Sequence, residues 1–409
     1  MRTLLITAGS RGDIQPFVAL ARGLASAGHD AVVAGPRRFA SVAADHDVPF
    51  APLDDRWLDL QDELADKGAR AAFTAARAAK SLLRPMFDDI AAAAERGADV
   101  VVYHPKTLVG PHVADKLGVP SVLASLIPLY LPTAEFPSPV FPVRLPRALN
   151  RASWRLAGAV ETPFRGLVRA WRSESLGLPG RSPSLARRAA DGPPLHAWSR
   201  HLLPAPADWP PGAAPTGFWS LPAPATWTPP DRLARFLKDG DPPVYVGFGS
   251  MVNRDPEDLT RTVLGAIRRT GRRAVLATGW GGLRPGDEPD GVLVLREAPH
   301  DWLLPRTALA VHHGGIGTVA AAMAAGVPQI VRPFLGDQTF WGWRVHGIGV
   351  GPAPLTGRLT PDRLAGAIDR AKSEPGYAER ARAVAAKLSA EDGVAAAAAA
   401  IERLTQRVG

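Results

Sequence analysis

The chain has 409 residues, more than one ordinary hydrophobic core accommodates, so two domains are expected. Its 46% hydrophobic and 21% charged residues are typical of a soluble globular protein, and it lacks the apolar run of a membrane-spanning helix. The lack of cysteine excludes disulfides and thiolate metal sites and favours a cytoplasmic protein, while the net charge of +9 suits an anionic partner. Nucleic acid is disfavoured because no known nucleic-acid motif appears.

The first half alternates strand and helix signals. The expected strands are Thr3–Ala8, Asp30–Ala34, Val48–Ala51, Ala98–Tyr103 and Ser121–Ser125. The expected helices are Ile14–Ala27, Arg37–Asp45 and Val109–Leu117. The apolar start resembles a short signal core but has no convincing cleavage region, so it is interpreted as a core strand. The alternation predicts right-handed βαβ units and a mostly parallel sheet.

The second half repeats this pattern after a proline-crowded segment, Pro204 to Pro230, which cannot form regular helix or strand except for a possible strand end near Gly217–Trp219. The expected strands are Val244–Gly247, Arg273–Thr278, Val292–Leu295, Leu309–Val311 and Gln329–Val331. The expected helices are Asp255–Thr270, Val319–Ala325 and the stretch Tyr377–Val408. Two doubly wound α/β domains are therefore predicted, with ligands at the carboxyl ends of their strands.

The most informative segment runs from His312 to Thr318 and contains three glycines. It follows a predicted strand and precedes a predicted helix. Glycines allow close approach of the backbone, and the N–H groups at a helix N-terminus attract negative charge. Gly336-Asp337-Gln338 follows and offers side chains that can bind sugar hydroxyls. This combination indicates a nucleotide-sugar site.

Five segments carry a resemblance to a known family. They are Gly9 to Pro16, Gly247 to Met251, Thr278 to Leu283, Pro299 to Pro305 and His312 to Pro352. In these segments the chain resembles the family-one glycosyltransferases of the GT-B fold, closest to the sterol glucosyltransferases and the glycosyltransferases that decorate antibiotics.

The resemblance implies two facing Rossmann-like domains with a cleft between them. Residues 1–215 would bind the acceptor, 216–230 would be the linker and 231–385 would bind the nucleotide-sugar donor. Residues 386–409 would form a helix that packs back on the first domain. The resemblance also implies transfer with inversion at the anomeric carbon, with no metal or other cofactor.

Asp13 is the predicted general base, because transfer to an alcohol requires a group that accepts the hydroxyl proton. The alternative is that Asp13 only caps the helix expected to begin at Ile14. Many relatives, including plant enzymes, carry a histidine here that a distant aspartate orients. An exposed aspartate with a pKa of about 3.9 is a weak base, so the role calls for a desolvated site that raises this pKa.

His313, Gly315, Gly317 and Thr318 are the predicted ligands of the donor diphosphate. Fixed N–H donors and a helix N-terminus would stabilise its developing charge. The alternative for His313 is a buried histidine satisfied by the backbone. His312 should point the opposite way and serve packing.

Further donor contacts are predicted outside the glycine turn. Ser250 would touch phosphate or simply form a turn, and Trp280 would cover the base or sugar or pack in a core. Ala298 and His300 would lie beside the nucleobase. Asp337 and Gln338 would bind sugar hydroxyls, with loop capping by Asp337 as the alternative.

The acceptor site is expected in the apolar, proline-studded segment Pro128 to Pro146. The predicted acceptor contacts are Ile14, Leu129, Tyr130, Phe136 and Phe141. An ordinary core loop is the alternative for the residues of that segment. The arginines between Arg144 and Arg188 are expected to form a solvated basic face, or else to contact an anionic membrane.

The leading interpretation is a transferase that moves a hexose from a UDP or dTDP sugar to a hydrophobic acceptor such as a sterol or polyketide. A nucleotide-sugar epimerase and a catalytically silent auxiliary protein are the alternatives. A dinucleotide oxidoreductase is disfavoured, because the first turn is Gly-Ser-Arg-Gly-Asp rather than G-x-G-x-x-G.

Overall fold

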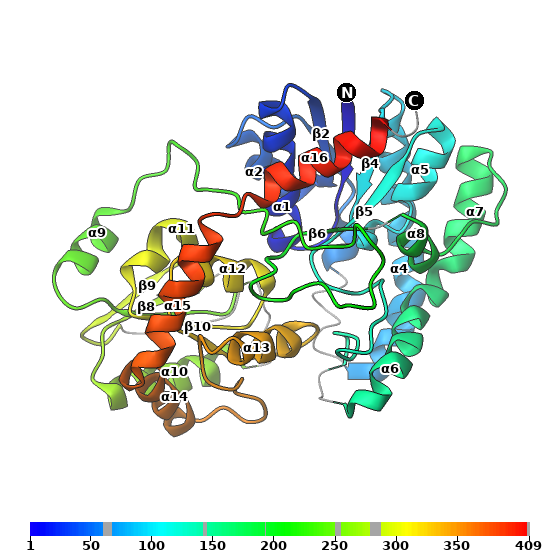
Figure 1. The fold of residues 1–409 in the computed structure, drawn as a ribbon. Coiled ribbons are helices and arrows are strands. Elements are labelled where there is room, and N and C mark those ends of the chain that lie inside the picture. The colour runs from blue at the N-terminus through cyan, green and yellow to red at the C-terminus, as the bar shows by residue number, and fades with distance from the viewer. Residues whose placement is uncertain (60–67, 142–144, 193, 250–254, 279–287, 407–409) are drawn as a thin grey trace. The chain divides into compact units, whose positions relative to one another are not determined.

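The computed structural model describes residues 1–59, 68–141, 145–192, 194–249, 255–278 and 288–406. These residues divide into two compact units (Figure 1). Unit 1 comprises Met1–Val140, Arg144–Leu221 and Asp392–Gly409, and unit 2 comprises Phe141–Val143 and Pro222–Glu391. Each unit is a parallel sheet with helices around it, so the predicted pair of Rossmann-like α/β domains is confirmed.

Unit 1 contains a parallel sheet of order β3-β2-β1-β4-β5-β6. Its strands are β1 (Arg2–Ile6), β2 (Asp30–Pro36), β3 (Phe50–Leu53), β4 (Val100–Tyr103), β5 (Ser121–Ser125) and β6 (Leu195–His196). Its α-helices are α1 (Arg11–Ser26), α2 (Ala40–Ala44), α4 (Gly68–Ala94), α5 (Gly110–Leu117), α6 (Asn150–Ala157), α7 (Arg165–Leu176), α8 (Leu185–Asp191) and α16 (Gly393–Gln406). The centre of β1 is continuously buried, as expected for a parallel strand covered on both faces.

Helix α1 begins three residues earlier than the predicted start at Ile14. Ser10 is its N-cap residue, and the backbone N–H of Ser10 donates to the Asp13 carboxylate at 2.7 Å. The first turn, Arg11-Gly12-Asp13, has no apolar residue. A prediction based on the spacing of apolar residues therefore begins the helix too late. Asp13 therefore lies inside the first turn rather than before it.

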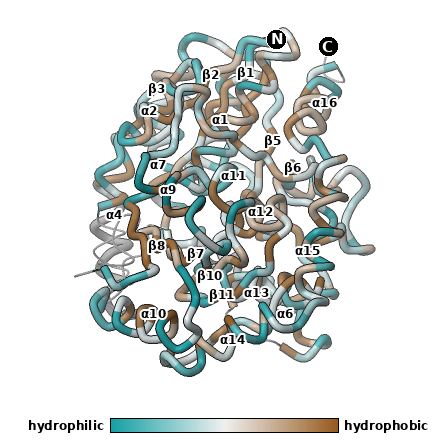
Figure 2. The backbone as a smooth tube through the Cα atoms, turned by 90° about the vertical axis from the view of Figure 1, so that its left-hand side faces the viewer, coloured by the Kyte–Doolittle hydropathy of each residue, from teal (hydrophilic) through white to brown (hydrophobic). Residues whose placement is uncertain are grey.

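Unit 2 contains a parallel sheet of order β11-β10-β7-β8-β9. Its strands are β7 (Val244–Gly247), β8 (Ala274–Ala277), β9 (Val292–Leu295), β10 (Leu309–His312) and β11 (Gln329–Val331). Its α-helices are α9 (Asp231–Lys238), α10 (Pro256–Thr270), α11 (His300–Leu303), α12 (Ile316–Ala324), α13 (Gln338–Gly347), α14 (Pro361–Ser373) and α15 (Pro375–Leu388). Helix α10 alternates between hydrophilic and hydrophobic colours in Figure 2, and its buried residues include Leu259, Val263 and Ile267.

The structure differs from the sequence analysis in three local details. The strand end near Gly217–Trp219 is wrong, since these residues form no strand. The described part of the stretch Tyr377–Val408 is helical as expected, and it is divided into α15 and α16 by Ser389–Asp392. The long helix α4 was not anticipated, although its side chains Leu83, Phe87 and Ile90 are buried at helical spacing.

The proline-rich segment behaves as predicted. Residues 204–230 form neither helix nor strand, apart from one isolated bridge between His196 and Pro215.

The C-terminal helix α16 packs against α1 within unit 1. In the described parts of the chain, no helix combines the length and apolar character needed to cross a bilayer.

Candidate functional site

The Asp13 carboxylate lies in the first turn of α1, just beyond the carboxyl end of β1. Its side chain is 12% exposed. One oxygen, Oδ2, accepts from the Ser10 N–H at 2.7 Å and from the Ser10 hydroxyl at 3.0 Å. Asp13 therefore helps cap its own helix, as the alternative supposed, and this contact also fixes the direction of the carboxylate.

Two residues from a distant part of the chain complete this carboxylate's surroundings. The Lys106 ammonium donates to Asp13 Oδ1 at 2.9 Å and to Oδ2 at 2.8 Å. His104 Nε2 lies 3.5 Å from Asp13 Oδ1. Both residues follow β4, which pairs with β1 in parallel, so the two carboxyl ends meet at one edge of the sheet. The sequence analysis missed both residues.

The pKa of Asp13 is lowered, whereas the sequence analysis called for a site that raises it. Burial raises the pKa of Asp13, but Lys106, His104 and the Ser10 N–H more than offset burial, so this pKa lies below its ordinary value. Burial also lowers the pKa of His104 to about 4, so its ring is neutral near pH 7. The site is thus desolvated as expected, yet it holds an ionised carboxylate.

The tautomer of His104 follows from its second contact. Its Nδ1 accepts the backbone N–H of Lys106 at 3.2 Å, so in the neutral ring the proton sits on Nε2. This Nε2–H faces Asp13 Oδ1. The neutral ring of His104 and the ammonium group of Lys106 therefore both lie against the Asp13 carboxylate.

In unit 2 the glycine turn joins β10 to α12, as predicted. Gly314 has φ of +93°, and a β carbon there would lie 2.9 Å from the backbone oxygen of Gln338. A β carbon on Gly315 would lie 2.4 Å from His313 Nε2. The turn is therefore shaped by glycines that leave room for the His313 ring and bring the start of α13 against the turn.

The N-terminus of α12 carries no side-chain cap, because its N-cap residue is Gly315. Gly317 is exposed and Thr318 is half-buried, both in the first turn of this helix. Burial lowers the pKa of His313 to about 4, so its ring is neutral near pH 7. Its Nδ1 is buried and has no hydrogen-bond partner among the described residues. The arrangement presents helix N–H groups and an unsatisfied ring nitrogen, which suits an anionic ligand.

His312 has the structural role that was predicted for it. It is fully buried, its Nδ1 accepts the Gly314 N–H at 3.1 Å, and its Nε2 lies 3.0 Å from Gln329 Oε1. These contacts tie the glycine turn to the neighbouring strand β11.

Asp337 and Gln338 both anchor the loop that carries them. Gln338 Oε1 accepts the backbone N–H groups of Phe334 at 2.7 Å and Leu335 at 3.1 Å. Asp337 Oδ2 accepts the indole N–H of the buried Trp341 at 2.7 Å. Asp337 is the N-cap residue of α13 but forms no side-chain cap bond there among the described residues, and the backbone contacts of the loop come from Gln338. Binding of sugar hydroxyls by these two residues stays a prediction.

The remaining donor candidates lie in two groups. Ala298 and His300 are half-buried at the start of α11, where His300 Nε2 lies 2.9 Å from the hydroxyl of Tyr245 on β7. Burial and, after it, the charge of His300 lower the pKa of His313. Ser250 and Trp280 lie outside the described residues.

The predicted acceptor residues differ in exposure. Ile14 is fully buried, and Phe136 is 3% exposed and packs against Trp154 and Trp209, with ring centroids 6.0 and 6.4 Å apart. Leu129, Tyr130 and Phe141 are half-buried. The burial of Ile14 and the packing of Phe136 favour a core role for these two residues. Contact of the other three residues with an acceptor stays a prediction.

The arginine-rich segment has two kinds of members. Arg147, Arg151 and Arg155 are exposed, as expected for a solvated basic face. Arg172 and Arg188 instead converge on Asp115 of α5, at 2.6 and 2.7 Å. These two arginines therefore stabilise the unit, and contact of the exposed ones with an anionic membrane stays a prediction.

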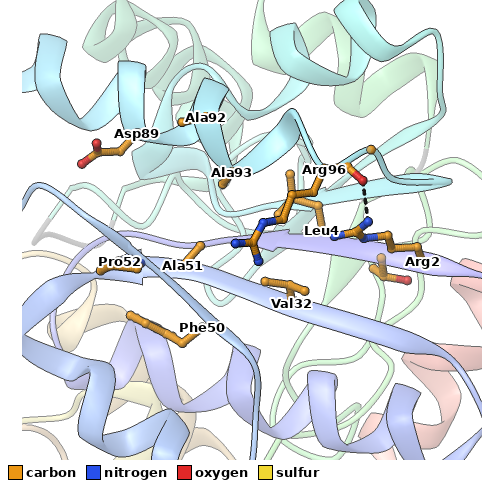
Figure 3. Close-up of a pocket in the computed structure, with 12 residues that line it drawn as sticks. Arg2, Leu4, Val32, Phe50, Ala51, Pro52, Asp89, Ala92, Ala93 and Arg96 are labelled. Carbon is orange, nitrogen blue, oxygen red and sulfur yellow. Dashed lines mark hydrogen bonds between the residues drawn. The ribbon is translucent and has the colours of Figure 1, made fainter.

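A cavity of about 250 Å³ lies between α4 and the strands β1, β2 and β3 (Figure 3). Arg96 extends from the end of α4 over the strand residues Ala51 and Val32. Arg2 and Leu4 place this cavity near the start of β1, whereas Asp13 follows its end. None of the predicted site residues that the structure describes lines it.

Comparisons with known proteins match both halves of the chain. The Glycosyltransferase family 28 N-terminal domain matches residues 3–134. The Erythromycin biosynthesis protein CIII-like, C-terminal domain matches residues 284–404. The matched regions contain Asp13 and the glycine turn respectively.

Similar proteins are known from plants and fungi. A sterol 3-beta-glucosyltransferase of Arabidopsis thaliana is 32% identical over 426 residues, which cover 98% of this chain and 68% of that protein. A sterol 3-beta-glucosyltransferase of Leptosphaeria maculans is 35% identical over 85% of this chain but only 25% of its own length. The chain thus spans about a quarter of that fungal relative.

Solved structures share the fold. The glycotransferase of kitacinnamycin superposes with a TM-score of 0.73 at 22% identity, covering 99% of both chains. At this level of identity the similarity establishes the two-domain architecture alone.

Proposed function

Because this chain belongs to the family-one GT-B glycosyltransferases, alongside the sterol 3-beta-glucosyltransferases, we propose that it is a hexosyltransferase. The donor is a UDP- or dTDP-linked hexose, and the acceptor is a hydroxyl group of a hydrophobic molecule such as a sterol or polyketide. The anomeric carbon forms a bond to the acceptor oxygen with inversion, while its bond to the diphosphate oxygen breaks.

The observation that carries the proposal is the glycine turn in unit 2. The buried His313 Nδ1 has no partner among the described residues, and it lies beside a helix N-terminus that no side chain caps. A diphosphate would accept from these groups, which are held in place before the reaction begins. Fixed N–H donors would then stabilise the negative charge of the leaving diphosphate, so the proposed reaction requires no metal or other cofactor.

In unit 1 the proton of the acceptor hydroxyl passes to the Asp13 carboxylate. The low pKa of Asp13 keeps this group ionised and therefore able to accept a proton across the neutral range. The family relationship supports a hydrophobic acceptor, since the curated relatives are named for sterols.

Calorimetry with UDP and dTDP side by side, followed by UDP-glucose, tests the donor site. We expect one diphosphate to bind with micromolar affinity and the chelator EDTA to leave that affinity unchanged. Absence of binding by all three ligands would overturn the donor site. Binding without diphosphate release across a panel of sterols and polyketide aglycones would instead favour the auxiliary-protein alternative.

Replacing His313 by alanine should weaken diphosphate binding by about tenfold to a hundredfold, since a hydrogen bond to a charged group is lost. Turnover should fall with it. Calorimetry on His313→Ala and on the control His346→Ala measures the effect, because His346 lies in the same unit and contacts the Gly351 carbonyl oxygen. Unchanged affinity in His313→Ala would contradict the phosphate role.

A further inference from the structure

We propose that Lys106 is a positioning residue that keeps the buried Asp13 ionised and so sets the pH range in which Asp13 can act as a base. The inference rests on the proposed function for its catalytic consequence. The ion pair itself is a feature of unit 1 and can be tested without any reaction.

The ion pair between Lys106 and Asp13 is less exposed to solvent than an ordinary surface ion pair, and it has two contacts. Its ammonium contacts both carboxylate oxygens, at 2.9 and 2.8 Å. The Asp13 side chain is 12% exposed, while that of Lys106 is 43% exposed. The carboxylate is thus desolvated, and the cation reaches it from the solvent side.

Burial makes the cation necessary. A carboxylate withdrawn from water has a raised pKa unless charges or donors compensate. Ser10 supplies a backbone N–H and a hydroxyl, and His104 faces Asp13 Oδ1 with the Nε2–H of a neutral ring. Lys106 adds the full positive charge that these neutral donors lack. Without it, the pKa of Asp13 would be higher, and at pH values below that pKa the group would be protonated and could not accept a proton.

The charge of Asp13 changes during the transfer. Asp13 starts as a carboxylate paired with an ammonium and ends as a neutral carboxylic acid when it takes the acceptor proton. The contribution of Lys106 is to select the ionised form of Asp13, at the expense of some basicity.

The first experiment titrates Asp13 directly. In protein labelled with ¹³C at aspartate carboxyl carbons, the Asp13 signal is identified by its loss in Asp13→Asn. We expect its titration midpoint to rise by about one pH unit or more in Lys106→Met, since an opposite charge in contact is removed. Lys106→Arg should keep the low midpoint, and so should Lys116→Met, which alters an exposed lysine of α5 in the same unit. An unchanged midpoint in Lys106→Met would overturn the proposal.

The second experiment measures kcat/KM against pH. In Lys106→Met the acidic limb should move upward by a similar amount, while activity recovers at pH values above the new midpoint, where Asp13 is ionised again. A purely structural lysine would lower kcat/KM equally at every pH, and that result would overturn the positioning role. If the wild-type protein transfers no sugar at all, the proposed function fails, and the carboxyl titration still decides whether Lys106 controls Asp13.

Discussion

Asp13→Asn should lower turnover by about a hundredfold to ten-thousandfold while donor affinity stays near that of the wild type. Asparagine has nearly the same shape, and its side-chain oxygen can still accept the Ser10 N–H that closes the first turn of α1. It cannot accept a proton, so the acceptor hydroxyl would react without a base. The donor candidates that the structure describes belong to unit 2, whereas Asp13 belongs to unit 1.

The measurement pairs steady-state diphosphate release with donor calorimetry on the same preparation. Asp45→Asn is a suitable control, because Asp45 is an exposed residue of unit 1 at the end of α2. Full turnover in Asp13→Asn would remove Asp13 from the role of base. Loss of donor affinity together with turnover would show that Asp13 belongs to the donor site instead.

The fold could be predicted from sequence wherever strands were buried on both faces. Such strands, for example Val244–Gly247 and Gln329–Val331, appear as short runs bounded by turn residues, and the structure has them at the predicted positions. Strand β6 has only two residues, Leu195 and His196, too few to show a period. Helix α4 has Pro85 in its interior, which by propensity argues against a helix, and burial of Phe87 and Ile90 overrides it.

The candidate site was predictable only where its residues are contiguous. His313, Gly315 and Gly317 lie in one turn between a strand and a helix, so sequence order alone brings them together. Lys106 is separated from Asp13 by 93 positions and meets it only because β4 is the neighbour of β1. The order of the strands in the sheet would have predicted this contact, since polar residues that follow adjacent parallel strands lie at the same edge. Strand order cannot be read from a single sequence.

Asp115→Ala should destabilise unit 1 by about 3 kcal/mol, near the lower end of the range for a broken buried ion pair. Asp115 Oδ2 accepts from Arg172 at 2.6 Å and from Arg188 at 2.7 Å, joining α5 to α7 and α8. Arg172 is 7% exposed, so loss of the carboxylate leaves a buried guanidinium without its counter-charge. Urea unfolding followed by tryptophan fluorescence would report the change, with the fully buried Trp171 on α7 beside the pair.

The pH dependence of this effect has a defined sign. Burial alone would raise the pKa of Asp115, but His112 and the two guanidinium groups hold that pKa well below its ordinary value. An acid whose pKa is lowered by folding contributes stability that is complete above its unfolded pKa of about 3.9 and is lost as pH falls. The stability difference between wild type and Asp115→Ala should therefore be full at pH 7 and shrink in more acidic solution.

Asp191→Ala provides the matched control for this buried pair. Asp191 accepts from Arg187 at 3.0 Å on α8, but both side chains are more than half exposed, at 54% and 71%. An exposed pair of this kind contributes about 0.5 kcal/mol or less, because water screens it and two side chains must be ordered. Equal losses in the two variants would contradict the argument that burial gives the Asp115 pair its strength. A large loss in Asp115→Ala alone would identify this ion-paired cluster as the contact that holds α7 and α8 against α5.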